Sequence, residues 1–251
     1  MTRLSVLVAI LVIVTSVGAV SGQEEPLDAE AILERVRATL GAESFHARVE
    51  LEITISGTTY RYLMEVWTLG EDRALVRILE PEVDAGSGYL QVGDDLWYYS
   101  PTVGTAVALP AIGLTQALFG AGPSLGDLAP GTLLRDFDAH AEAILGPTDE
   151  PGGYLLTLVP RPEAPVVYGK LEVTVTADYV LSEIVYYDQR GGVVRAVTFG
   201  EPLRVGDVLF PTEVVVVDAN GDRAIQRILD PEFEIGLDAS FFTVERLEGG
   251  K

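Results

Sequence analysis

The sequence predicts an α+β protein dominated by one antiparallel sheet of about ten or eleven strands. Most of the chain consists of short runs in which apolar and polar residues alternate, separated by polar, glycine-rich turns, and this pattern is typical of an antiparallel meander. Helical patterns occur only near the start and in the middle of the chain, which argues against a doubly wound α/β fold. Of the 251 residues, 48% are hydrophobic, so the chain can form one large core without a second domain.

The first residues have the features of a secretory signal peptide. Arg3 precedes an apolar run over residues 4–17, and small residues follow it. We therefore expect residues 1–22 to be a signal peptide and residues 23–251 to be one domain that is periplasmic or otherwise extracytoplasmic. An uncleaved N-terminal anchor stays open as the alternative, because the apolar run is only slightly shorter than a membrane span.

The composition excludes several kinds of site. The sequence contains no cysteine, so disulfides, a thiol nucleophile, a thiolate metal site and the lipid-modified cysteine of a lipoprotein are all excluded. The formal net charge is −21, which repels nucleic acid and anionic lipid head groups, so we expect no nucleic-acid partner. The charge favours solubility or a basic partner instead.

An amphipathic helix is expected over residues 27–41. Asp28 is a suitable N-cap and Gly41 a suitable stop. The helix needs a sheet to pack against, because its apolar residues form one stripe. That stripe comprises Ala29, Ile32, Leu33, Val36 and Leu40.

The clearest strand is predicted over residues 45–56, where apolar side chains from Phe45 to Ile55 alternate strictly with polar ones from His46 to Ser56. Such a strand has one buried and one hydrated face. Strands over residues 60–69 and 73–79 continue the meander after short polar turns.

Residues 86–110 are expected to form two strands joined by a turn at residues 93–95. The second strand places Trp97, Tyr98 and Tyr99 in a row, so large aromatic side chains lie on both of its faces. An uncovered face of this kind would expose a large apolar surface to water. We therefore expect part of the chain to cover these residues, or a ligand to bind to them.

The alternation stops between residues 111 and 152. A short apolar helix is predicted near residues 112–119, a glycine-rich hinge follows at 120–131, and residues 132–145 also look helical. We interpret this segment as a helical lid.

Strands resume after the lid. The Asn220-Gly221 pair is a strong hairpin signal, and it explains the closely spaced oxygens of Asp218 and Asp222 better than a calcium loop does. Residues 73–86 and 223–236 resemble each other, which indicates either corresponding strands or only a shared strand-then-proline pattern. The expected strands span residues 154–160, 170–177, 181–187, 193–199, 208–217 and 223–229.

Neither a catalytic nor a metal site is predicted. His46 and His140 are the only histidines and lie far apart, whereas a triad or a histidine metal site needs groups that converge. We therefore expect no enzyme activity and no cofactor.

A surplus of apolar side chains on both faces of several strands predicts an apolar cavity, because one helix and the lid are too little to cover a large curved sheet. The lipid-binding candidates are Val49, Leu51, Ile53, Tyr62, Met64, Val66, Leu90, Trp97, Tyr99, Leu118 and Phe119.

Four segments resemble LolA-like outer-membrane lipoprotein-sorting proteins, in an uncharacterised branch of that family. They are AEAILERVRATLG, YLMEVWTLGEDRALVRILEPEVDAGSGYLQVGDDLWYYSP, APVVYGKLEVTV and LDASFFTVERL. The resemblance covers most of the chain after the signal. It implies a strongly curved antiparallel half-barrel of about eleven strands, with helices over a hydrophobic cavity for acyl chains.

The same resemblance implies an extracytoplasmic carrier of a lipoprotein or lipid. Its partners would be acyl chains, an inner-membrane exporter and an outer-membrane acceptor, and it would need no cofactor. The alternative function is a ligand-sensing regulatory or scaffold module of the cell envelope.

Overall fold

The computed structural model describes residues 28–40, 43–70, 72–110, 137–145, 151–162, 164, 166–205 and 208–249. Within these residues, thirteen strands form one sheet and two more form a separate hairpin, so the predicted count of about eleven was too low. The order across the large sheet is β6 (Ala106–Leu109), β5 (Asp95–Tyr99), β4 (Gly88–Val92), β3 (Arg73–Glu80), β2 (Thr58–Leu69), β1 (Ser44–Ile55), β15 (Arg223–Phe233), β14 (Glu213–Asp218), β11 (Val193–Phe199), β10 (Leu181–Tyr187), β9 (Lys170–Thr176), β8 (Pro151–Pro160) and β7 (Phe137–Leu145).

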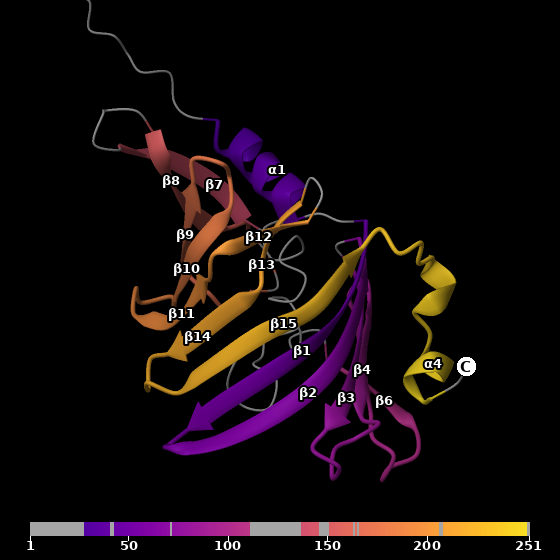
Figure 1. Cartoon of the computed structure of the whole chain (residues 1–251). Helices are drawn as coiled ribbons and strands as arrows, with labels where there is room; N and C mark the ends of the chain where they lie inside the picture. The colour runs from indigo at the N-terminus through magenta and orange to yellow at the C-terminus, as the bar shows by residue number, and fades with distance from the viewer. Residues whose placement is uncertain are drawn as a thin grey trace, which may run out of the picture.

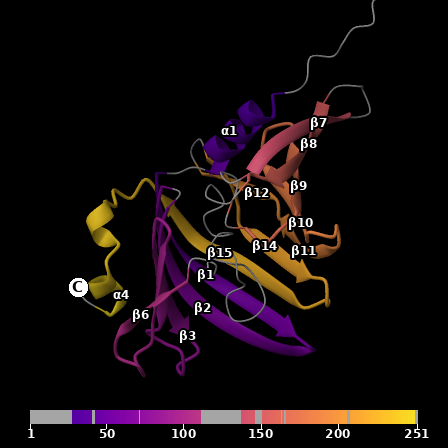
Figure 2. The same ribbon diagram turned by 180° about the vertical axis from the view of Figure 1, so that it is seen from behind.

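The sheet is open and antiparallel, and its ends are β6 and β7. Figures 1 and 2 show that it curls strongly, with the long β1–β2 hairpin and β15 crossing its middle. Consecutive strands are mostly neighbours, as expected for strands joined by short turns. The prediction of a curved antiparallel sheet is therefore confirmed.

The alternation along β1 sorts its side chains onto two faces. The residues at odd positions from Ala47 to Ile53 are at most 1% exposed and belong to the main hydrophobic core. The intervening residues from Arg48 to Thr54 are exposed or half-buried. We call the first side the inner face and the second the outer face, and both follow from the two-residue period of a strand.

The two similar stretches noted in the sequence occupy corresponding places. β3 pairs with β2 and β15 pairs with β1, so the two strands flank the central hairpin. Each pairing has a register shift, between Leu63 and Met64 in one case and between His46 and Arg48 in the other. Such bulges bend a strand and increase its twist, so both sides of the hairpin contribute to the curvature.

Helix α1 (Ala29–Leu40) packs on the inner face, where it contacts β7 and β13 (Val208–Pro211). The predicted N-cap is confirmed, because the Asp28 Oδ1 accepts a hydrogen bond of 3.1 Å from the Ala31 N–H. Leu33 and Val36 are at most 1% exposed. At the surface, Arg161 pairs with Glu30 and with a side chain of β7, which holds the helix against the sheet edge.

The C-terminal segment, residues 237–249, packs on the outer face of β3 to β6. It contains the 3-10 helix η3 (Ala239–Phe241) and the short helix α4 (Val244–Leu247). Phe242 and Leu247 are buried against Leu75 and Leu90 of the sheet. The Glu248 carboxylate accepts a 2.7 Å hydrogen bond from the Ala106 N–H, which satisfies a donor on edge strand β6.

Three element predictions differ from the structure. Residues 86–110, expected to form two strands, form the three strands β4, β5 and β6. The expected helix over residues 132–145 is strand β7 from Phe137 onwards, because Phe137, Ala139 and Ala141 pack into the core and alternate with polar residues. The expected strand over 208–217 is divided into β13 and β14 at Pro211, which lacks a ladder N–H. β13 instead pairs with β12 (Pro202–Val205).

The expected signal peptide and most of the expected lid lie outside the described residues, so both stay predictions. Within the part of the chain that is described, no helix is long and apolar enough to cross a membrane.

The two faces of β1 predict different costs of mutation. Leu51→Ala removes a side chain that is 1% exposed, so the free energy of unfolding is expected to fall by about 2–5 kcal/mol. Glu50→Ala changes the adjacent, exposed position and is expected to alter stability by less than about 0.5 kcal/mol. Urea unfolding measures both, and equal costs for the two variants would contradict the assignment of faces.

Candidate ligand-binding site

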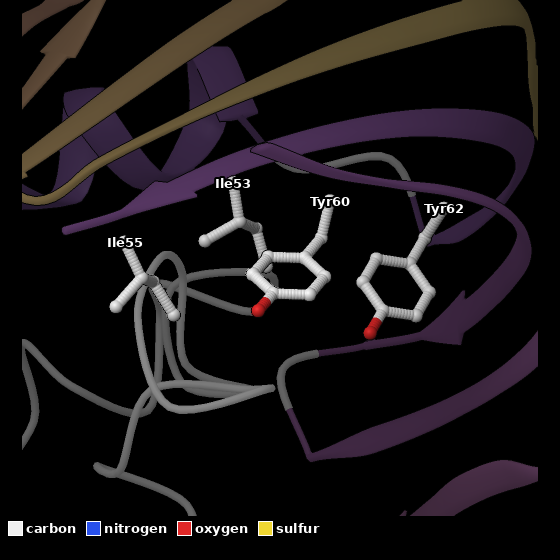
Figure 3. A pocket seen from close by; sticks show the side chains of 4 residues that line it. All are labelled: Ile53, Ile55, Tyr60 and Tyr62. Carbon is white, nitrogen blue, oxygen red and sulfur yellow. The ribbon is translucent and has the colours of Figure 1, made fainter. Parts of the chain in front are cut away.

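A hollow of about 190 Å³ lies on the inner face near the end of the β1–β2 hairpin. Ile53 and Ile55 of β1 and Tyr60 and Tyr62 of β2 line it, and Figure 3 shows their side chains on the same side of the hairpin. Ile53 lies directly opposite Tyr60 in the register. Residues two apart on a strand share a face, so this register brings all four together.

The pocket has an apolar floor and phenol walls. Ile53 is 1% exposed, whereas Tyr60 is 49% exposed, so the pocket runs from the core to the surface. Drug-sized ligands occupy pockets of about 300–1,000 Å³, so the volume here suits a segment of an acyl chain better than a whole bulky ligand. The arrangement offers apolar contact and hydroxyl groups to a ligand.

A cluster of tyrosines continues from this pocket across the inner face. Tyr89 of β4 and Tyr98 of β5 face each other with ring centroids 5.0 Å apart. Burial raises the pKa of Tyr89 to about 12, with smaller contributions from Tyr98, Tyr62 and Asp84. Burial and the Asp84 charge also raise the pKa of Tyr62. The phenols of Tyr62 and Tyr89 therefore stay neutral at physiological pH.

The structure brings together five of the predicted candidates on the inner face. Val49, Leu51, Ile53, Met64 and Val66 are all at most 2% exposed and belong to one core. Ile53 lines the pocket, and so does the half-buried sixth candidate Tyr62. The other four belong to the same core cluster and are not among the residues that line the pocket.

Three candidates lie elsewhere, which corrects the expectation of a single wall. Leu90, Trp97 and Tyr99 belong to the outer-face cluster under the C-terminal segment. The reason is strand alternation, because their neighbours Tyr89 and Tyr98 occupy the inner face of the same hairpin. Leu118 and Phe119 lie outside the described residues.

The sequence analysis missed Ile55 and Tyr60 as pocket residues, and Tyr89, Tyr98 and Asp84 as members of the neighbouring cluster. Ile55 was placed on the apolar face of its strand, and that pattern was the available signal. Tyr60 was identifiable only through the register that sets it opposite Ile53. Extending the alternation across the hairpin finds both.

The two histidines do not converge. His46 lies on the outer face, where its Nδ1 is 2.8 Å from Glu232 and its Nε2 is 3.0 Å from Glu65. Its ring stacks on Trp67, with centroids 5.2 Å apart. His140 is exposed on β7. Among the described residues, no group of three potential ligands could hold a metal ion.

A family model described as "uncharacterized protein" matches residues 70–249, which is most of the chain. The chain belongs to this family. No curated protein matches the sequence.

Solved structures show the fold more directly. A domain described as an outer-membrane lipoprotein-sorting protein, from Vibrio parahaemolyticus, is similar with a TM-score of 0.77 at 17% identity, over 88% of this chain and 98% of that one. A LolA superfamily protein from Nitrosomonas europaea is similar with a TM-score of 0.72 at 23% identity, over 87% of this chain and 98% of that one. A DUF1329 family protein from Desulfovibrio piger is similar with a TM-score of 0.77 at 15% identity, over 86% of this chain and 96% of that one. This family member therefore has the LolA fold.

His46 makes the stability of this LolA-fold protein depend on pH. Partial burial is the largest single effect and lowers the pKa of His46. The hydrogen bonds to Glu232 and Glu65 and the charges of these two carboxylates together outweigh it, so the net pKa lies above the usual 6.5. The resulting stabilisation is fully present below pH 6.5 and is lost as the pH rises through the raised value.

His46→Gln is therefore expected to destabilise the protein more at about pH 5.5 than at about pH 8.5. Urea unfolding at both pH values measures this difference. His140→Gln is the matched control, because it makes the same substitution at an exposed position of β7. An equal cost of His46→Gln at the two pH values would contradict the prediction.

Proposed function

We propose that this protein is an extracytoplasmic carrier that binds acyl chains of a lipoprotein or lipid on the inner face of its sheet. The observation that carries the proposal is the pocket at the end of the β1–β2 hairpin. It opens from the apolar core of a curved LolA-fold sheet and is lined by two isoleucines and two tyrosines. Apolar contact of this kind suits hydrocarbon.

The similar structures support the same class of function. One of them is described as a lipoprotein-sorting domain and another as a LolA superfamily protein, and both align along nearly their whole length. The proposal involves reversible binding without a cofactor or covalent chemistry.

The proposed location is the periplasm or an equivalent compartment outside the cytoplasm. The expected signal peptide at residues 1–22 supports export, and the cysteine-free sequence suits an oxidising compartment because no thiol can be oxidised. A carrier in this place would receive its cargo from an inner-membrane exporter and deliver it to an outer-membrane acceptor.

Native mass spectrometry of the protein exported from its host tests the proposal. We expect copurified lipid or acylated protein, and binding of a fluorescent fatty-acid probe after delipidation. A chain that is always empty and binds no acyl probe would overturn the carrier function. A stable protein partner in place of lipid would favour the regulatory or scaffold alternative.

A matched pair of variants locates the binding. Ile55→Asp places a charge in the pocket and is expected to weaken acyl-probe binding by at least about tenfold, because burying a carboxylate against hydrocarbon is costly. Thr54→Asp introduces the same charge on the outer face and should leave probe affinity unchanged. Equal affinities for the two folded variants would place the binding site elsewhere.

A further inference from the structure

We propose that the tyrosine cluster beside the pocket recognises an ammonium head group, so that the cargo is a lipid with a cationic or zwitterionic amine head. This inference rests on the proposed function, because it assigns the polar end of the ligand whose acyl chain enters the pocket. The cluster comprises Tyr60, Tyr62, Tyr89, Tyr98 and Asp84.

The cluster adjoins the pocket through one shared residue. Tyr62 lines the pocket with Ile53 and Ile55, and its pKa responds to Asp84. Leu63 pairs with Glu80, so the β3–β4 loop that carries Asp84 begins beside Tyr62, and Tyr89 follows that loop on β4. Tyr62 and Asp84 both contribute to the raised pKa of Tyr89, which agrees with this placement. An amphiphile with its chain against the isoleucines would therefore place its head among the phenols.

The loop between β3 and β4 holds Asp84 in place. The Asp84 N–H donates to the Pro81 carbonyl at 3.0 Å, and the Asp84 carbonyl accepts from the Ser87 N–H at 3.0 Å. The Gly86 N–H donates to the Ile78 carbonyl at 2.9 Å, which ties the loop to β3. Asp84 is half-buried, and these hydrogen bonds fix the backbone from which its carboxylate projects.

The chemistry of the cluster favours a cation. Aromatic faces attract ammonium groups, and cages of aromatic rings are a recurrent arrangement for quaternary ammonium ligands. The high pKa of Tyr89 keeps its phenol neutral, so the carboxylate supplies the negative charge at the cluster. The net charge of −21 further disfavours an anionic amphiphile.

The arginines of the adjoining strands are engaged on the opposite face. Arg61 alternates with Tyr60 and Tyr62 along β2 and pairs with Glu52 at 2.9 Å. Arg77 of β3 donates to the Arg246 carbonyl in the C-terminal segment. Both therefore lie away from the tyrosine cluster, where they would otherwise favour phosphate or sulfate.

Isothermal titration with three amphiphiles of equal chain length tests the proposal on the full-length exported protein. The probes are dodecyltrimethylammonium, dodecyl maltoside and dodecyl sulfate, each below its micelle concentration in about 0.15 M salt, where surface charges are screened within about 8 Å. We expect the ammonium probe to bind about tenfold more tightly than the sulfate probe.

Four variants decide whether the cluster causes this preference. Asp84→Asn and Tyr62→Leu are expected to abolish the preference, whereas Tyr62→Phe keeps the ring and should retain it. Asp95→Asn removes the same charge from the exposed β4–β5 turn and should also retain the preference, which separates local recognition from the overall negative charge. If Asp84→Asn does not fold, the comparison of Tyr62→Leu with Tyr62→Phe decides whether the cluster causes the preference.

The outcomes separate the two proposals. Failure of all three probes to bind would overturn the carrier function itself. Equal binding of the three probes, or a preference that survives both Asp84→Asn and Tyr62→Leu, would overturn the ammonium inference while leaving acyl-chain carriage intact.

Discussion

The alternation of side chains along the central β1–β2 hairpin is the constraint on which the rest of the structure depends. Each inner position must be covered by apolar groups, and each outer position must tolerate water or a second covering layer. Residues such as Leu51 and Met64 meet the first demand in the main core. On the outer face, charged pairs such as Arg61 with Glu52 cover the middle of the sheet, and the C-terminal segment covers β3 to β6.

This division separates stability from binding. α1 packs near β7 and β13, away from the end of the β1–β2 hairpin in Figure 1, and the pocket lies at that hairpin end. The inner row continues there through Ile55 and Tyr60, whose side chains are only partly buried. The outer cluster around Trp97 contributes packing on the opposite side. Substitutions in the outer cluster should lower the free energy of unfolding without changing the geometry of the pocket, which the β1–β2 hairpin forms.

The sequence predicted the sheet well because periodicity is local. The alternation from Phe45 to Ile55, the Asp28 cap and the Asn220-Gly221 turn each depend on neighbouring residues, and all are present in the structure. The face of Trp97 could not be predicted in this way. A strand with large side chains on both faces gives no local indication of which face points to the main core. Trp97 is covered by the C-terminal segment, which lies about 140 residues away in the chain. The helix predicted over residues 132–145 was wrong for a different reason: the alanines of β7 also favour a helix, and their alternation with polar residues decides for a strand only once Phe137, Ala139 and Ala141 pack on the core.

The low identity to similar structures follows from the same physics. A LolA-fold sheet requires apolar residues at alternate positions and permits many choices among them, so 15–23% identity is enough to keep the fold. The partly exposed end of the inner row is less constrained, because its side chains need not fill a close-packed core. Tyr60 and Tyr62 occupy that end here. The proposed preference for an amine therefore rests on residues of this chain, where Tyr62 lines the pocket and the loop with Asp84 begins beside it.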